Sequence, residues 1–229
     1  MTLERHPLEP FLPSGATTLF LGSFPPPRER WSMDFFYPNF INDFWRIQGL
    51  IHFGDARWFE LRAEEGRKRF DRERIEAFCA ERGLAFFDTA TAVRRLKDNA
   101  SDAFLEIVEP TDVGALLARM PACRRLVTTG GKASDELASI LSAAGASLAS
   151  LASPVSSASD FSSETSADTD ATVVKVGEPV AGLRLPPIGD CVRIRAWDRP
   201  LEWWRMPSTS RAYPLSLDKK AAFYRRLVL

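Results

Sequence analysis

Short apolar runs that alternate with helix-like segments constrain the fold of this chain more than any other feature. Residues 17–23, 84–88 and 125–129 have the composition of buried strands, and residues 192–197 and 203–206 predict two more. Segments with helical character lie between these runs. Such alternation predicts an α/β fold, a three-layer α/β/α sandwich with a central, mostly parallel sheet.

Capping residues mark the expected helices. Asp71 is a suitable N-cap and Gly83 a suitable C-terminal residue for a helix between them. A helix over 39–50 would place Phe40, Phe44 and Ile47 on one face, while Phe44 and Trp45 are expected in the core. Further helices are expected after a Thr111 cap to about residue 119, over 132–144, and over 217–227 after a Ser216 cap.

One segment departs from this alternation. Of the 31 residues in 142–172, 21 are Ser, Ala or Thr, and the only charges are acidic. Such a composition buries too little apolar surface to offset the entropy lost on ordering. We expect one domain over 1–229, with a flexible low-complexity insertion at 142–172.

Cysteine, histidine and apolar patterns exclude several classes of protein. No apolar run approaches the roughly 20 residues of a membrane span, and residues 1–7 lack a secretory pattern. The three cysteines are far apart and are expected as reduced thiols, and with only two histidines a zinc site is not expected. The chain is predicted to be cytoplasmic, with no membrane and no obligatory protein partner.

The charge distribution is uneven although the net charge is zero. Residues 193–226 contain nine Lys or Arg and three Asp or Glu, whereas 133–174 contain no Lys or Arg. A local basic surface can bind phosphates even when the net charge of the whole chain is not positive. It can also be an ordinary solvated surface.

Two loops follow predicted strands, where open α/β sheets bind their ligands. The first begins Gly22-Ser23-Phe24-Pro25-Pro26 and continues through Phe36-Tyr37-Pro38-Asn39 to Asn42-Asp43-Phe44-Trp45. The second is Met206-Pro207-Ser208-Thr209-Ser210-Arg211. Together they resemble the active-site loops of the uracil-DNA glycosylase superfamily, in particular its mismatch-specific and hypoxanthine-type branches.

The resemblance implies roles for residues of the first loop. Phe36 would stack on an extruded base, Tyr37 would shape the pocket and Ser23 would read the base edge. Asp88, at the end of a strand, matches a pocket position that is often acidic or Asn in the family, although it could instead cap the next segment. The substrate-binding set is Gly22, Ser23, Phe24, Pro25, Phe36, Tyr37 and Asp88.

The second loop resembles the minor-groove loop of that superfamily. Ser and Thr hydroxyls and an Arg suit contacts to DNA phosphates. Lys132, after a Gly-Gly turn that lacks the phosphate-loop pattern, is a further candidate contact or simply a surface residue. The DNA-binding set is Lys132, Pro207, Ser208, Thr209, Ser210 and Arg211.

Two positions depart from the better-known branches. Phe24 and Met206 stand where those branches have polar catalytic residues, and neither can orient water or bind a leaving base anion. In the hypoxanthine-type branch an Asn later in the first motif acts instead. The matching catalytic candidates are Asn42 first and Asn39 second, with helix capping as the alternative for Asn42.

The resemblance therefore implies a monofunctional DNA glycosylase of base-excision repair. It would flip uracil or hypoxanthine out of DNA and hydrolyse the N-glycosidic bond to leave an abasic site, with no metal or organic cofactor. A non-catalytic binder of damaged or single-stranded DNA on the same fold is the alternative. An unrelated small-molecule hydrolase is a third possibility, but the chain has no Gly-x-Ser-x-Gly motif.

Overall fold

A six-stranded sheet lies at the centre of the computed structural model, which describes residues 2–61, 68–96, 104–148 and 184–228. Its first four strands pair in parallel, and the last two pair antiparallel. In spatial order the strands are β5 (Leu84–Asp88), β2 (Thr18–Gly22), β8 (Arg125–Thr129), β11 (Arg199–Met206), β10 (Asp190–Ala196) and β9 (Ser147–Leu148).

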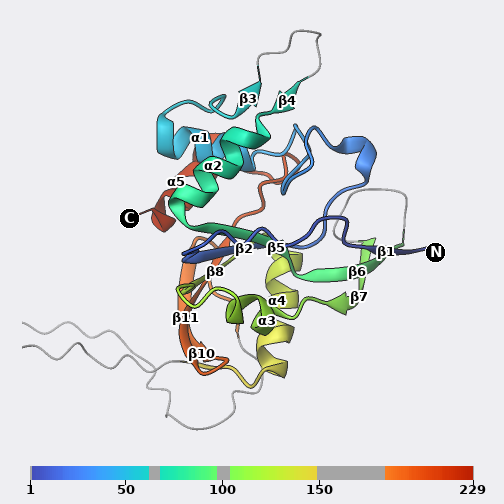
Figure 1. Cartoon of the computed structure of the whole chain (residues 1–229), viewed down its shortest axis with the longest axis vertical. Coiled ribbons are helices and arrows are strands. Elements are labelled where there is room, and N and C mark those ends of the chain that lie inside the picture. The colour runs from blue at the N-terminus through green and yellow to red at the C-terminus, as the bar shows by residue number, and fades with distance from the viewer. Residues whose placement is uncertain (1, 62–67, 97–103, 149–183, 229) are drawn as a thin grey trace, which may run out of the picture.

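Helices cover both faces of this sheet (Figure 1). On one side lie α1 (Phe44–Phe53), α2 (Arg72–Arg82) and α5 (Leu217–Tyr224), and on the other α3 (Val113–Ala118) and α4 (Gly131–Ala143). The helical elements that the structure describes also include the 3-10 turns η1 (Arg28–Arg30) and η3 (Arg225–Leu227). The predicted three-layer α/β/α architecture with a mostly parallel sheet is confirmed.

Two smaller sheets are absent from the prediction. Strands β1 (Leu3–Arg5), β6 (Ala90–Arg95) and β7 (Leu105–Pro110) form an antiparallel sheet beside β5, and β3 (Glu60–Leu61) pairs with β4 (Arg69–Phe70). Strand β1 alternates exposed and half-buried residues and carries charges that pair across strands, as Arg5 does with Glu109. An edge strand of this kind has no apolar run to mark it.

Most predicted caps are confirmed. The Asp71 side chain accepts from the Arg74 N–H, Gly83 adopts the left-handed conformation with φ of 63°, and the Ser216 hydroxyl accepts from the Lys219 N–H. The Thr111 cap is wrong, because Asp112 caps α3. Thr111 instead donates its hydroxyl to the Asp88 carbonyl at 2.7 Å.

The predicted start of the first helix is also wrong. Helix α1 begins at Phe44 and extends to Phe53, so residues 39–43 are outside it. The cause is a pair of side-chain turns: Asn39 Oδ1 accepts from the Ile41 N–H, and Asn42 Oδ1 accepts from the Phe44 N–H. Asn side chains that bond to backbone two residues ahead compete with helix formation.

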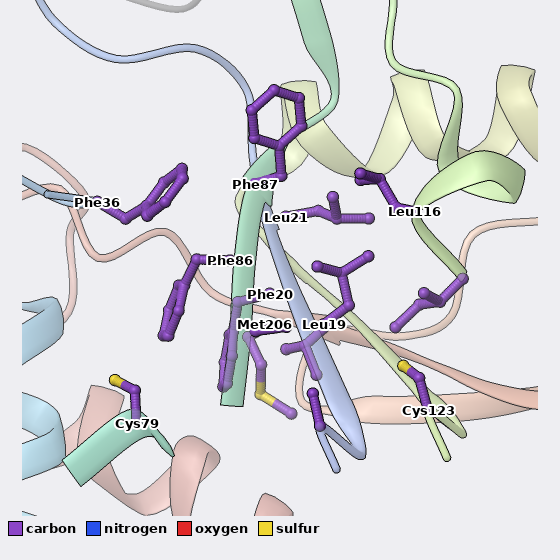
Figure 2. Packing of buried hydrophobic residues seen from close by; sticks show 14 of the residues in the cluster. Leu19, Phe20, Leu21, Phe36, Cys79, Phe86, Phe87, Leu116, Cys123 and Met206 are labelled. Carbon is purple, nitrogen blue, oxygen red and sulfur yellow. The ribbon is translucent and has the colours of Figure 1, made fainter. Parts of the chain in front are cut away.

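The main core joins β2 and β5 to the helical layers (Figure 2). Leu19, Phe20 and Leu21 are buried, and the Phe20 ring stacks on Phe86 with centroids 5.3 Å apart. Phe44 and Trp45 are fully buried, as predicted. Three free cysteines are present: Cys79 and Cys123 are buried, which raises the pKa of each thiol, and Cys191 is half-buried.

Part of the predicted insertion is described. Residues 142 and 143 end α4, and residues 147–148 form β9, which pairs with β10. The rest of 142–172 lies outside the described residues, and the single-domain organisation stays a prediction. No helix among the described residues is long and apolar enough to span a membrane.

The contribution of the Asp71 N-cap to the stability of α2 can be tested by substitution. Asp71→Ala should lower the free energy of unfolding by about 1 kcal/mol, because the Arg74 N–H loses its acceptor. Urea titration followed by circular dichroism measures this. Asp135→Ala, at an exposed position of α4, is the control and should change stability by less than about 0.5 kcal/mol. Equal losses in both variants would contradict the capping role.

Candidate functional site

A cavity of about 560 Å³ opens where the four parallel strands end. Gly22, Asp88, Thr129 and Met206 are the last residues of β2, β5, β8 and β11, and the parallel register brings these ends to one edge. The loops that follow β2 and β11 close over this edge. The predicted site residues that line the cavity are Gly22, Ser23, Phe24, Pro25, Phe36, Tyr37, Asn39, Asn42, Asp88, Ser208, Thr209, Ser210 and Arg211.

A carboxylate lies against the glycine at the end of β2. A Cβ built on Gly22 would lie 2.4 Å from Asp88 Oδ1, so only glycine allows this approach. The other oxygen, Oδ2, lies 3.0 Å from Nε2 of the buried His6 ring. His6 Nδ1 in turn lies 2.8 Å from the Leu8 carbonyl oxygen. His6 therefore holds Asp88 in place at the cavity.

Aromatic rings form one wall of the cavity. Phe36 is 4% exposed and lies nearly parallel to Phe86, with ring centroids 5.8 Å apart and 23° between planes. The Phe36 carbonyl accepts from Trp45 Nε1 at 3.0 Å. This bond fixes Phe36 to the start of α1, and Figure 2 shows the Phe36 ring on the same side of β5 as the Phe86 ring.

Tyr37 adopts an unusual backbone conformation beside Phe36. Its φ is 52°, in the region that favours glycine, where a bulky residue persists only when its surroundings impose it. Its ring stacks on Phe44 at 3.9 Å with 4° between planes, and its hydroxyl lies 2.8 Å from Thr129 Oγ1. Tyr37 thus joins the first loop to the end of β8.

The two candidate catalytic amides line the cavity and also shape the turn before α1. The Asn42 Oδ1 atom accepts from the Phe44 N–H at 2.8 Å, so the capping alternative holds for that atom. Asn42 is half-buried and is one of the residues that line the cavity. Asn39 Oδ1 accepts from the Ile41 N–H at 3.1 Å.

Residues 208–211, which we call the 208–211 loop, form the opposite wall. Ser208 Oγ accepts from the Ser210 N–H, and Ser210 Oγ accepts from the Ala212 N–H. Behind this loop Tyr224 donates its hydroxyl to the Pro207 carbonyl at 2.9 Å. Burial raises the pKa of Tyr224 well above its usual value, so this phenol stays protonated and remains a donor.

Ionic contacts tie the 208–211 loop to the start of α1. Asp43 is buried and accepts from Lys220 Nζ at 2.8 Å, and Arg211 lies 3.5 Å from its other oxygen. The Asp43 N–H also donates to the Thr209 carbonyl at 2.9 Å. These contacts bring the two predicted loops together around one cavity.

Two predicted DNA-binding residues do not line the cavity. Lys132 is half-buried in the first turn of α4, where its charge lowers the pKa of Glu136 against the larger opposing effect of burial. Pro207 lies behind the cavity, and its carbonyl accepts from Tyr224. Met206 is 1% exposed and belongs to the core, as Figure 2 shows.

Sequence reasoning missed several contributors, of which three have basic side chains. His6 holds Asp88, Lys220 holds Asp43, and Arg30 lines the cavity. His6 and Lys220 lie 82 and 177 residues from their partners, and no local pattern indicates contacts of such separation. Arg30 follows the Pro25-Pro26-Pro27 run and so belongs to the first loop, which was the one available signal.

Comparison with known proteins supports the fold. The chain is similar to a solution NMR structure of a protein from Methanosarcina acetivorans, described as a “putative Uracil DNA glycosylase”. The TM-score is 0.54 at 17% sequence identity, and the match covers 100% of both chains. No protein-family model and no curated protein sequence matches the chain. The chain therefore shares its overall fold with that protein.

The close approach of Gly22 and Asp88 can be tested by adding a single methyl group at residue 22. Gly22→Ala should lower the free energy of unfolding by about 1–3 kcal/mol, because the added Cβ must displace a carboxylate that His6 holds. Gly131→Ala is the matched control, since its Cβ would meet no atom within 4 Å. Urea titration of both variants measures the difference, and an equally stable Gly22→Ala protein would contradict the packing described.

Proposed function

We propose that this protein is a monofunctional DNA glycosylase that removes a deaminated base, uracil or hypoxanthine, from DNA. The observation that carries the proposal is the convergence of both predicted loops on one cavity at the carboxyl ends of β2, β5, β8 and β11. Its volume lies within the range of about 300–1,000 Å³ that is usual for small-molecule sites. The similarity of the fold to that of the protein described as a “putative Uracil DNA glycosylase” supports the same proposed activity.

The cavity offers complementary groups for a flipped base. The Phe36 ring supplies an apolar face for stacking, and the Asp88 carboxylate can accept an N–H from the base edge. Uracil and hypoxanthine each carry such an N–H beside a carbonyl. A base inside a duplex is out of reach of these groups, so the nucleotide has to leave the stack.

Hydrolysis requires water at C1′ of the deoxyribose as the base departs. The bond between C1′ and the base nitrogen breaks with its electron pair moving to the base. A C1′–O bond to water forms, and the proton that this water loses passes through solvent to the departing base anion. Asn42 is the proposed residue that orients the water, because it lines the cavity while its Oδ1 is anchored to the backbone. For a transition state with positive charge on the sugar, such placement matters more than basicity.

The 208–211 loop is the proposed contact to the DNA backbone. Its Ser and Thr groups can donate to phosphate oxygens, and the Arg211 guanidinium lies at the cavity with about half of its side chain exposed. Lys132, which does not line the cavity, is proposed as a more distant phosphate contact.

Excision by the Asn42 variant tests the catalytic assignment. Asn42→Ala should lower the single-turnover rate of base release by about 100-fold or more, as expected when a positioned catalytic group is lost. The measurement uses end-labelled oligonucleotides with uracil or hypoxanthine, followed by alkali. Asn39→Ala, which also removes a side-chain turn at the cavity, is the comparison and should retain a much larger share of the rate. Equal rates for Asn42→Ala and wild type would refute the role of Asn42.

The salt dependence of DNA binding tests the role of Arg211. Arg211→Ala should reduce the slope of log K against log salt by about 1, because one phosphate contact is lost. Fluorescence anisotropy with labelled duplex at several salt concentrations gives the slope. Arg193→Ala is the control, since this exposed residue of β10 does not line the cavity. A slope unchanged by Arg211→Ala, or changed equally by both variants, would count against this contact.

A DNA-binding protein without glycosylase activity is the second candidate. The observation that favours it is the apolar character of two positions: Phe24 packs with Ala90, Val93 and Leu105, and Met206 is buried in the main core. Neither can activate water. Retained DNA binding without release of any base would support this candidate over the first.

A further inference from the structure

A buried ion pair joins the two walls of the cavity. Lys220 Nζ donates to Asp43 Oδ2 at 2.8 Å and to the Ser210 carbonyl at 2.7 Å. The Asp43 N–H donates to the Thr209 carbonyl at 2.9 Å. Asp43 directly follows Asn42, so these three contacts fix the 208–211 loop relative to the proposed catalytic amide.

The burial of this pair indicates a role in geometry more than in stability. Lys220 is 0% exposed and Asp43 is 6% exposed. Removing two charges from water offsets most of their mutual attraction, so a buried pair adds little net stability over an apolar pair of similar shape. The directional hydrogen bonds of the Asp43–Lys220 pair nevertheless restrict α1, α5 and the 208–211 loop to a single relative arrangement.

Asp43 also contacts a second cation, Arg211, which is far more exposed than Lys220. Arg211 lies 3.5 Å from Asp43 Oδ1, and its side chain is 55% exposed at the cavity. Lys220 has no access to solvent and cannot exchange Asp43 for a ligand, whereas Arg211 can move to a phosphate. Asp43 would then remain paired with Lys220, and the link to Asn42 would persist while the loop binds DNA.

We propose that Asp43 and Lys220 are positioning residues that couple the 208–211 loop to the placement of Asn42. The proposal rests on the proposed glycosylase function. Neither residue is assigned a contact with substrate. Their expected effect is therefore on the rate of the chemical step, with a smaller effect on affinity for DNA.

Lys220→Met tests the coupling, with Lys219→Met as the matched control. Lys219 is the preceding residue of α5 and is exposed, so its variant removes the same charge without touching Asp43. Lys220→Met should lower the single-turnover excision rate by at least about tenfold, because a displacement of about 1 Å can cost about 100-fold in rate. Its affinity for a duplex with a tetrahydrofuran abasic-site analogue should change less than about threefold, and Lys219→Met should match wild type in both.

A second variant keeps the test valid if Lys220→Met does not fold. Asp43→Asn preserves the shape of the side chain and an oxygen acceptor but removes the negative charge. It should also slow excision, and the double variant with Lys220→Met should be no slower than the slower single variant, because both act through one contact. Unchanged excision rates in folded Lys220→Met or in folded Asp43→Asn would overturn the proposal.

Hydrogen exchange separates this proposal from the proposed function. Exchange of the Asp43 amide, which donates to Thr209, should accelerate by at least about fivefold in Lys220→Met or Asp43→Asn, with β2 amides unchanged. Lys219→Met should exchange as wild type does. If wild type releases no base, the glycosylase proposal fails, and this exchange alone decides whether the pair holds the two walls together. Unchanged exchange at Asp43 in both variants would then overturn it.

Discussion

The parallel pairing of β2 with both β5 and β8 is the constraint on which the rest of this structure depends. Gly22 lies opposite Asp88 and Leu21 opposite Thr128, while Met206 lies opposite Thr129. Because these strands run in one direction, their carboxyl ends share an edge, and the loops that follow β2 and β11 meet there. The cavity is a consequence of this register.

Several residues at the cavity have structural and proposed functional tasks at once. Asn42 accepts from the Phe44 N–H with its side-chain oxygen and also lines the cavity. Tyr37 tolerates a positive φ because its ring stacks on Phe44 and its hydroxyl reaches Thr129. Residues with a strained backbone, or with both a structural and a functional role, are concentrated in sites that must be rigid before the ligand binds.

The core strands and most caps could be predicted because they depend on local patterns. The run Leu19-Phe20-Leu21 is apolar and bounded by turns, and Asp71 and Gly83 are standard cap residues. The start of α1 could not be predicted from the pattern, since Asn39 and Asn42 use their side chains to hold a turn in place of a first helical turn. Strand β1 also gave no signal, because it is short, charged and mostly exposed.

The candidate site could be predicted as two loops but not as a connected structure. Residues 22–25 and 208–211 were identifiable from their types and from the strands before them. The contacts of His6 with Asp88 and of Lys220 with Asp43 depend on the tertiary fold, since each partner lies far away in the sequence. Lys132 illustrates the opposite case: its Gly-Gly turn packs beside Ser208, but Lys132 itself does not line the cavity.

The central claim is that the cavity releases a free base from DNA. The most direct measurement is mass-spectrometric detection of bases released by the wild-type protein from single- and double-stranded oligonucleotides. These would contain uracil, hypoxanthine, xanthine or no lesion. We expect free uracil or free hypoxanthine, with an equal amount of abasic sites and no release from undamaged DNA. The absence of any released base at saturating protein, with DNA binding retained, would contradict the claim.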